Sequence, residues 1–154
     1  MDIGELLVRD GVVLKTGASS KRQALHSVAT AAAHAIGLDE SKVFDALMER
    51  ETLGSTGLGA GVAMPHARLE GIDRVQAVFV RLDSPVPYDA VDDRPVDLIF
   101  ALFAPPRDGA DHLRALAAVS RALRSAKMRE QLRQARTVDA IHALFVRNET
   151  ATAA

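Results

Sequence analysis

The stretch from Gly54 to Arg68 concentrates the residue types that are most capable of chemistry. It reads Gly-Ser-Thr-Gly-Leu-Gly-Ala-Gly-Val-Ala-Met-Pro-His-Ala-Arg and holds four glycines within eight residues. Successive backbone N–H groups in such a loop can form a nest that binds an anion, and the hydroxyls of Ser55 and Thr56 add donors. The stretch lacks the Lys-Ser/Thr ending of a nucleotide-binding P-loop. Taken alone, a glycine-rich pattern is more often a plain turn.

His66 follows the glycines on a segment that we predict to be extended. Pro65 disfavours a helical conformation for the residue before it. In a strand, Val62, Met64 and His66 share one face, so two apolar side chains hold the histidine beside the glycines. Arg68 lies on the same side of the alternation. Anion donors and a nucleophile would converge here, as in a reactive site, and a hydrogen-bonded structural histidine is the alternative.

Two more polar residues are candidates because of their places on predicted helices. His112 begins the spacing His112, Leu116, Val119, Leu123, which puts it on the inward face at a helix N-terminus, where the helix dipole favours anions. The alternative is a half-buried capping residue. Arg50 lies at the C-terminal end of another helix, four residues before the glycine stretch, where a cation is also favourable for the helix itself.

Cysteine is absent, which excludes disulfides, cysteine nucleophiles and thiolate metal sites. A metal-dependent hydrolase would need carboxylates beside His66 and His112, but neither histidine has one in a ligand-like spacing such as H-E-x-x-H. We therefore expect no metal and no cofactor. A small-molecule sensor that uses the glycine stretch is a further alternative. The remaining histidines flank their helix stripes, and we interpret them as surface residues: His26, His34 and His142.

The segments that position the candidate residues alternate between strands and helices. Strands are predicted over 11–14, 75–82 and 96–104. The last is apolar almost throughout, which favours a central strand that is buried on both faces. The polar segment over 88–96 is typical of an exposed hairpin or loop.

Helix signals occur in both halves of the chain. Ser20 and Gln23 form a capping box that opens a helix, and Gly37 ends it. The other predicted helices start near Asp39, cover about 110–125 and 127–135, and run from a Thr137 cap to near Val146, with a frayed tail over 148–154. These elements predict an α/β fold in which a mixed central β-sheet is flanked by helices on both faces, an α/β sandwich.

The chain of 154 residues, 48% of them hydrophobic, is sized for a single domain over 1–154 with its core over about 5–147. Its net charge of −1 does not favour general nucleic-acid binding. No signal peptide is visible and the longest apolar run, Leu98 to Ala104, is too short to span a bilayer, so we expect a soluble cytoplasmic protein that is not embedded in a membrane.

Charge is unevenly distributed along the second half of the chain. Residues 83–97 hold five Asp and one Arg, whereas residues 107–136 hold eight Lys or Arg and three acids. Such runs are usually solvated faces. The alternative is a pair of docking patches for charged partners.

Three stretches together resemble a known family. They are Arg50-Glu-x-x-Gly-Ser-Thr-Gly-x-Gly-x-Gly-Val-Ala-Met-Pro-His66, then Tyr88-Asp-Ala-Val-Asp-x-x-Pro-Val-Asp-Leu-Ile-Phe-Ala-Leu102, then His112-Leu-x-x-Leu116. Over about residues 5–147 the chain resembles the enzyme IIA proteins of the bacterial phosphoenolpyruvate-dependent phosphotransferase system, of the fructose/mannitol type. The second stretch makes it most similar to the nitrogen-regulatory member.

The resemblance implies a role for each candidate residue. His66 would be the phosphoryl acceptor, using Nε2 while a backbone carbonyl holds the other ring nitrogen. His112 matches the second active-site histidine, and Arg50 with the Ser55 and Thr56 hydroxyls matches the polar groups around the phosphate. Two departures are small: Met64 replaces the usual Ile or Val, and Ala67 replaces a frequent Gly.

The resemblance also implies partners. The donor would be a phosphohistidine carrier protein of the HPr type, and regulatory targets would include transporters or sensor kinases. The chain would be a phosphotransferase component that forms a phosphohistidine and turns over no small molecule. Sugar transport needs a IIB domain, whose own acceptor is a cysteine in this branch of the family, and a membrane IIC channel. We find no cysteine in this chain, and we expect no membrane span and no second domain within its 154 residues. The simpler hypothesis is a regulatory switch, and the alternative is the IIA component of a fructose/mannitol transport relay.

Overall fold

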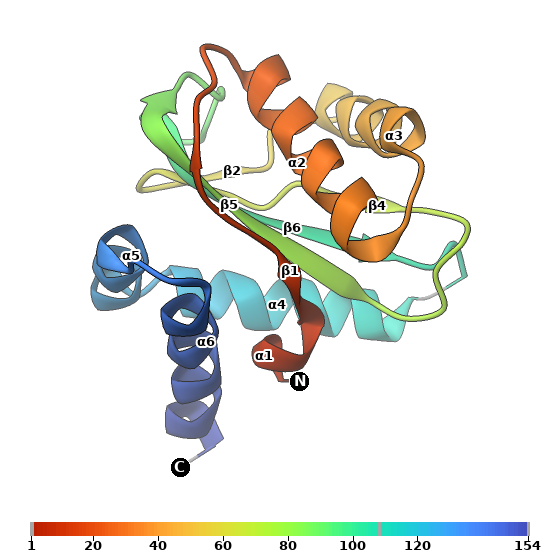
Figure 1. Ribbon diagram of the computed structural model, residues 1–154. Coiled ribbons are helices and arrows are strands. Elements are labelled where there is room, and N and C mark those ends of the chain that lie inside the picture. The colour runs from red at the N-terminus through yellow and green to blue at the C-terminus, as the bar shows by residue number, and fades with distance from the viewer. Residues whose placement is uncertain (1, 108, 154) are drawn as a thin grey trace.

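The computed structural model describes residues 2–107 and 109–153, and it shows a six-stranded sheet between two layers of helices (Figure 1). The strand order is β1-β5-β6-β3-β2, and β4 also pairs with β6. The sheet is mixed, because β1 runs parallel to β5 while β5 runs antiparallel to β6. The strands are β1 (Leu7–Thr16), β2 (Gly57–Gly59), β3 (Val62–Ala63), β4 (His66–Arg68), β5 (Gln76–Val86) and β6 (Val96–Ala104). The predicted α/β sandwich is confirmed.

Helices cover both faces of the sheet. One layer consists of α2 and α3, and α4 lies across the opposite face with α1, α5 and α6 beside it (Figure 1). The predicted caps are present: Ser20 and Asp39 accept hydrogen bonds from the N3 amides of their helices, and Gly37 ends its helix with a φ of 83°. The helices are α1 (Ile3–Leu6), α2 (Lys21–Ile36), α3 (Glu40–Thr52), α4 (Ala110–Leu123), α5 (Ala126–Gln134) and α6 (Val138–Ala153).

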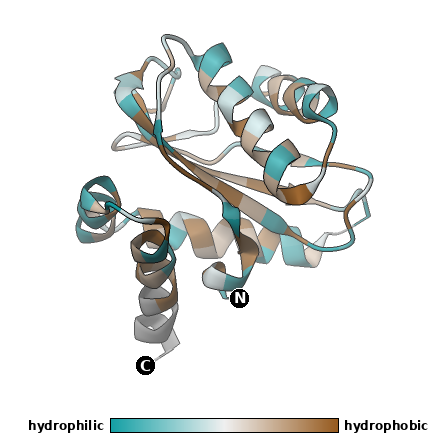
Figure 2. Cartoon of the chain, in the orientation of Figure 1, coloured by the Kyte–Doolittle hydropathy of each residue, from teal (hydrophilic) through white to brown (hydrophobic). Residues whose placement is uncertain are grey.

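β6 is the central strand, with the bounds that its apolar run predicts. Its side chains alternate between the two layers: Leu98, Phe100 and Leu102 pack in the core shared with α4, whereas Ile99 and Phe103 pack in the core shared with α2 and α3. Figure 2 shows the resulting apolar strands between helices that carry both hydrophobic and hydrophilic residues. Burial on both sides explains why this strand carries an unbroken apolar run.

The segment that carries His66 is two short strands rather than one. β3 and β4 both run parallel to β6, and the register is the same on both sides of the break, since Val62 pairs with Leu98 and His66 with Leu102. At the break, the carbonyl of Pro65 accepts a hydrogen bond from the Leu102 amide at 3.0 Å. Within the described residues β4 pairs with β6 alone, so His66 lies on an edge of the sheet.

The glycine stretch forms a β-hairpin, which agrees with the plain turn that such a pattern more often indicates. Gly57 of β2 pairs with Ala63 of β3, and the chain turns through Ala60 and Gly61 with positive φ values of 56° and 82°. The Ala60 amide donates to Asp92 at 2.9 Å, so the turn binds a carboxylate of this same chain. The glycines beyond position 57 therefore serve the tight turn.

Arg133 of α5, on the α4 side of the sheet, binds this hairpin. Its Nη2 atom donates to the Ala60 carbonyl and to Asp97, both at 2.9 Å. The contact joins the acidic segment 83–97 to the basic segment 107–136 within one chain. Part of each charge bias therefore stabilises the fold. The hypothesis that the remaining charges form docking patches stays a prediction.

Several segments differ from the sequence predictions. The first strand extends over Leu7–Thr16 rather than 11–14, the strand predicted over 75–82 is β5 and reaches Val86, and α1 was not predicted. The last helix continues to Ala153 where a frayed tail over 148–154 was expected, and residue 154 lies outside the described residues. The segment 88–96 is not simply exposed, because Tyr88 and Ala90 are buried against Gly57. Among the helices described, none has the length and apolar character needed to cross a membrane.

Candidate functional site

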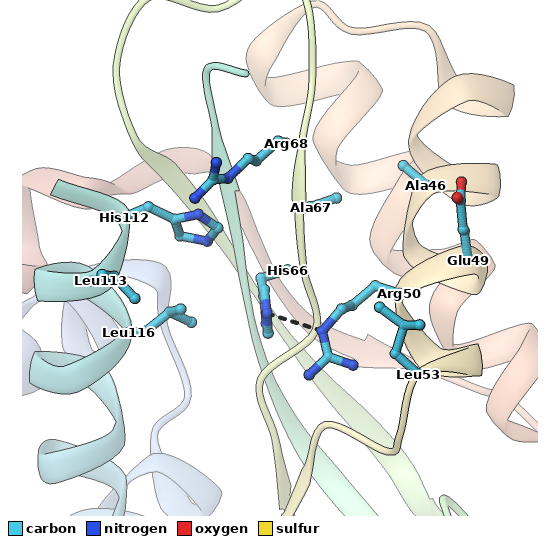
Figure 3. A pocket seen from close by; sticks show the side chains of 10 residues that line it. All are labelled: Ala46, Glu49, Arg50, Leu53, His66, Ala67, Arg68, His112, Leu113 and Leu116. Carbon is cyan, nitrogen blue, oxygen red and sulfur yellow. Dashed lines mark hydrogen bonds between the residues drawn. The ribbon is translucent and has the colours of Figure 1, made fainter. Parts of the chain in front are cut away.

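A cavity of about 570 Å³ opens where the end of α3, the edge strand β4 and the start of α4 meet (Figure 3). Because β4 is an edge strand, side chains from both helix layers reach it. Three of the predicted site residues line the cavity: His66, Arg50 and His112. The other lining residues are Ala46, Glu49, Leu53, Ala67, Arg68, Leu113 and Leu116.

The ring of His66 is half-buried and held at both nitrogens. Its Nδ1 atom lies 3.0 Å from the carbonyl oxygen of Met64, and its Nε2 atom lies 3.2 Å from Nε of Arg50. A carbonyl only accepts hydrogen bonds and a guanidinium only donates them. The two partners therefore assign the proton to Nδ1 and the lone pair to Nε2.

The surroundings of His66 favour the neutral ring. Burial lowers the pKa of His66 from its ordinary value of 6.5, and the positive charge of Arg50 lowers it further. The hydrogen bond to Met64 and the carboxylate of Glu51 act in the opposite direction, and the net pKa shift is downward. A neutral imidazole with its lone pair on Nε2 is a nucleophile once the Arg50 hydrogen bond to that lone pair is released.

Arg50 reaches His66 from the last turn of α3. Its Nη1 atom donates to the Gly54 carbonyl at 2.8 Å, just beyond the helix end, and its Nε atom donates to His66. Figure 3 shows the guanidinium beside the imidazole and facing the cavity. The cation thus lies where it would meet an anion bound to Nε2.

His112 approaches from the opposite helix layer. It lies in the first turn of α4, is 5% exposed, and faces inward as its helical spacing predicts. Its ring meets that of His66 in an edge-to-face contact with centroids 5.5 Å apart. The structure therefore brings the two histidines together although 46 positions of sequence numbering separate them.

Ser55 and Thr56 do not line the cavity. The Ser55 hydroxyl donates to the Tyr88 carbonyl at 2.9 Å, and the Thr56 hydroxyl donates to Glu51 at 2.6 Å. The Thr56 amide also donates to Glu51, at 3.0 Å. Both hydroxyls are thus engaged behind the site, and a direct role at a phosphate stays a prediction.

Sequence reasoning placed Arg68 beside His66 and Leu116 beside His112 but did not identify Glu49, Leu53 or Leu113 as residues of the cavity. Arg68 extends into it from β4, on the side of His66 that its place in the alternation predicts (Figure 3). Leu53 and Leu113 stand on opposite sides with exposed fractions of 82% and 65%. Exposed leucines on either side of a charged centre are suited to contact with another protein. No periodicity signals them, because Leu53 follows its helix and Leu113 points away from the core.

The remaining histidines lie away from the cavity. His26 and His34 are exposed, as expected of surface residues. His142 is half-buried instead: burial lowers its pKa, and its Nε2 atom is buried without a hydrogen-bond partner in the described structure. No group of three or more potential metal-ligating His, Cys, Asp or Glu side chains occurs in the described part of the chain.

Comparison with known proteins places this geometry in context. Residues 5–148 match the family described as phosphoenolpyruvate-dependent sugar phosphotransferase system, EIIA 2. The nitrogen regulatory protein of Bradyrhizobium diazoefficiens is 40% identical over 145 residues, which cover 94% of this chain and 95% of that protein. The crystal structure of nitrogen regulatory protein IIA-Ntr from Neisseria meningitidis is 34% identical, has a TM-score of 0.87, and covers 93% of this chain and 98% of its own.

A more distant structure shows the same fold. IIA mannitol from Escherichia coli is 23% identical, with a TM-score of 0.73, and the alignment covers 88% of this chain and 96% of that one. The family match spans all three sequence stretches on which the resemblance is based, including Arg50 to His66 and the start of α4.

Proposed function

Because the chain belongs to the EIIA 2 family of the phosphoenolpyruvate-dependent sugar phosphotransferase system, we propose that His66 accepts a phosphoryl group and signals by its phosphorylation state. The observation that carries the proposal is the lone pair of His66 Nε2. It faces a cavity that also holds Arg50 and His112. The proposed donor is a phosphohistidine carrier protein of the HPr type.

The proposed transfer is an in-line displacement at phosphorus. Nε2 of His66 forms the new P–N bond while the P–N bond to the donor imidazole breaks, and its electron pair returns to the donor nitrogen. Positive charge develops in the His66 ring, and the Nδ1–H bond to the Met64 carbonyl stabilises it. Phosphoryl transfer requires chiefly positioning and stabilisation of spread negative charge.

Arg50 has to change partner during this step. In the resting site its Nε–H occupies the lone pair that attacks phosphorus. An incoming phosphoryl oxygen, being anionic, competes for the guanidinium and frees Nε2. Arg50 and His112 then lie on two sides of the transferred group, and Ser55 and Thr56 support the segment that leads to it.

A regulatory output is supported by the names of the similar proteins, which include nitrogen regulatory proteins that align over nearly their full length. A phosphoryl group brings roughly −1.5 to −2 charges, by analogy with other phosphorylated side chains. This charge would appear between the exposed side chains of Leu53 and Leu113. Partners such as transporters or sensor kinases would then bind one phosphorylation state better than the other.

The test of the acceptor role is an intact-mass measurement after incubation with phosphoenolpyruvate, enzyme I and the carrier protein. We expect the mass of one phosphoryl group to be added. Absence of the gain, with a relay that phosphorylates another acceptor in parallel, would reject the proposal.

The regulatory role needs a separate test. Phosphorylated and unphosphorylated protein are used to capture partners from a lysate of the native organism. A coupling of about 1–3 kcal/mol between phosphorylation and binding would change partner affinity about 5- to 150-fold. Identical partners in both states, with fast transfer to a sugar-specific IIB protein, would instead establish the fructose/mannitol relay.

A further inference from the structure

A buried polar cluster lies behind the His66 cavity and makes no contact that the proposed transfer step uses. We define the Glu51 cluster as Lys21, Glu51, Thr56 and Tyr88. These residues come from the start of α2, the end of α3, the segment before β2 and the segment after β5. The side chain of Glu51 is 5% exposed and Tyr88 is 1% exposed. Four separate parts of the chain therefore meet in this cluster.

Three donors hold the Glu51 carboxylate. Lys21 Nζ lies 3.0 Å from Oε1, the Thr56 amide donates to the same oxygen at 3.0 Å, and the Thr56 hydroxyl donates to Oε2 at 2.6 Å. Hydrogen bonds to an ionised carboxylate are stronger than neutral ones, and they fix geometry accordingly. Both carboxylate oxygens accept hydrogen bonds, which restricts the Glu51 side chain to one position.

Tyr88 completes the cluster from the opposite side. Its hydroxyl lies 3.2 Å from Thr56 Oγ1, and its ring lies 4.6 Å below Lys21 Nζ. The Thr56 hydroxyl has one proton, which it gives to Glu51, so the Tyr88 hydroxyl is the donor in its bond to Thr56. Burial raises the pKa of Tyr88, which keeps this donor protonated.

Two short paths connect the cluster to the ring of His66. On the first, the Thr56 carbonyl accepts from the Met64 amide at 3.0 Å, and the Met64 carbonyl accepts from His66 Nδ1 at 3.0 Å. The partner of Nδ1 is therefore held by backbone that pairs with Thr56.

On the second path, the chain leaves α3 through Gly54. The Gly54 amide donates to the Glu51 carbonyl at 3.2 Å, and the Gly54 carbonyl accepts from Arg50 Nη1 at 2.8 Å. The Glu51 side chain holds Thr56 two residues later. The course of residues 53–56 thus sets where the guanidinium of Arg50 stands.

We infer that the Glu51 cluster is a positioning device that fixes the tautomer of His66. It holds the Met64 carbonyl against Nδ1 and the Arg50 guanidinium against Nε2, so that the proton stays on Nδ1 and the lone pair on Nε2. The consequence for phosphoryl transfer rests on the proposed function. The effect on the His66 tautomer does not, because the tautomer can be measured in the unphosphorylated protein alone. In metal sites, mutation of an outer residue that orients a ligand typically lowers activity about 10- to 100-fold, and we expect a similar dependence here.

The test removes the Thr56 hydroxyl and keeps the shape of the side chain. Thr56→Val loses the bond to Glu51 and the acceptor for Tyr88, whereas Thr56→Ser keeps both. Thr30→Val is the matched control, because the Thr30 hydroxyl also donates to a glutamate, Glu40, at 2.7 Å on the exposed surface between α2 and α3. The readouts are the ¹⁵N spectrum of the His66 ring at neutral pH and the rate of phosphoryl uptake.

We expect Thr56→Val to show His66 exchanging between the two tautomers and to accept phosphoryl about 10- to 100-fold more slowly, with Thr56→Ser within about twofold of wild type. Thr30→Val should match wild type in both readouts. A purely structural role would lower the thermal midpoint of Thr56→Val and leave the tautomer unchanged. A folded Thr56→Val protein with the wild-type tautomer would overturn the inference.

A second variant keeps the test decisive if Thr56→Val does not fold. Tyr88→Phe removes only the hydroxyl that donates to Thr56, and it should shift the tautomer in the same direction by a smaller amount. An unchanged spectrum in Tyr88→Phe would overturn the inference in that case. Failure of the wild-type protein to accept phosphoryl would reject the proposed function, while the ring spectra still decide the positioning role.

Discussion

The imidazole of His66 meets that of His112 edge to face, with centroids 5.5 Å apart and an interplanar angle of 75°. One ring belongs to an edge strand and the other to the first turn of α4, so the contact joins the sheet to one helix layer. Arg50 joins His66 to the other layer. The proposed phosphoryl acceptor is thus approached from both sides by groups able to donate to an anion.

Replacing His66 with alanine should abolish phosphoryl uptake and leave the fold intact, because the proposed nucleophile is lost while the half-buried position tolerates a smaller side chain. Intact mass after incubation with the donor relay measures uptake, and circular dichroism measures the fold. His34→Ala, at an exposed position of α2, is the control and should be phosphorylated normally. An alanine variant at position 66 that still gains phosphoryl mass would disprove the assignment.

His112→Ala should still be phosphorylated, but more slowly. The variant loses a group that stabilises negative charge and keeps the acceptor, and removal of one such donor typically lowers a rate about 10²-fold or more. Rapid-quench measurement of phosphoryl uptake gives the rate. If His112→Ala accepts nothing while His66→Ala is phosphorylated, the roles of the two histidines are reversed.

The rate of phosphorylation should be independent of pH near neutrality and fall only below the ordinary histidine range. Burial, and then the charge of Arg50, lower the pKa of His66 below 6.5, so the nucleophilic neutral ring predominates at pH 7. The free energy of unfolding should also fall as the pH is lowered. Below pH 6.5 the unfolded chain binds the proton before the folded protein does, and the free energy of unfolding decreases.

Arg50→Met should raise the pKa of His66, because one of the causes that lower it is removed. Arg50→Lys keeps the positive charge and should leave the pKa closer to that of wild type. An NMR titration of the His66 ring in the three proteins measures the effect. A pKa that stays the same or falls in Arg50→Met would contradict the electrostatic account.

Gly61→Ala should destabilise the fold by about 1–3 kcal/mol. The residue has a φ of 82°, and a Cβ there would lie 2.3 Å from Nη2 of Arg133 and 2.9 Å from Asp97. The substitution would therefore strain the turn and displace the contact that binds α5 to the hairpin. Gly17→Ala is the control, because a Cβ at Gly17 meets nothing within 4 Å. Equal denaturation midpoints for the two variants would show that the Arg133 contact contributes nothing.

Segments that local sequence dictates were predicted well. The apolar run of β6 and the caps at Ser20 and Asp39 carry their signals within a few residues. β1 was underestimated, because Arg9 and Asp10 are exposed within it and a register shift separates Leu7 from Val12 in its pairing with β5. Exposed polar residues in an irregular strand do not produce an alternating pattern.

Site residues could be predicted where the pattern of a single strand or helix sets their direction. They could not be predicted where contacts between several elements set it. The alternation around His66 and the helical spacing of His112 identified two residues that face the cavity. The hydroxyls of Ser55 and Thr56 gave no such information, since their partners Tyr88 and Glu51 are set by tertiary packing. Tyr88 sits in a segment whose aspartates are typical of exposed loops, and its burial follows from close packing against Gly57.

The shared register of β3 and β4 along β6 has a consequence for how this family can vary in length. Side chains alternate between the two layers, so one residue inserted or deleted between Val62 and His66 would turn the histidine from the α4 side to the side of α2 and α3. The number of residues between the hairpin and His66 therefore determines the side of the sheet on which the histidine lies. A change of length inside this short interval would move His66 away from His112, and it would also invert Ala67 and Arg68, which lie in the same strand.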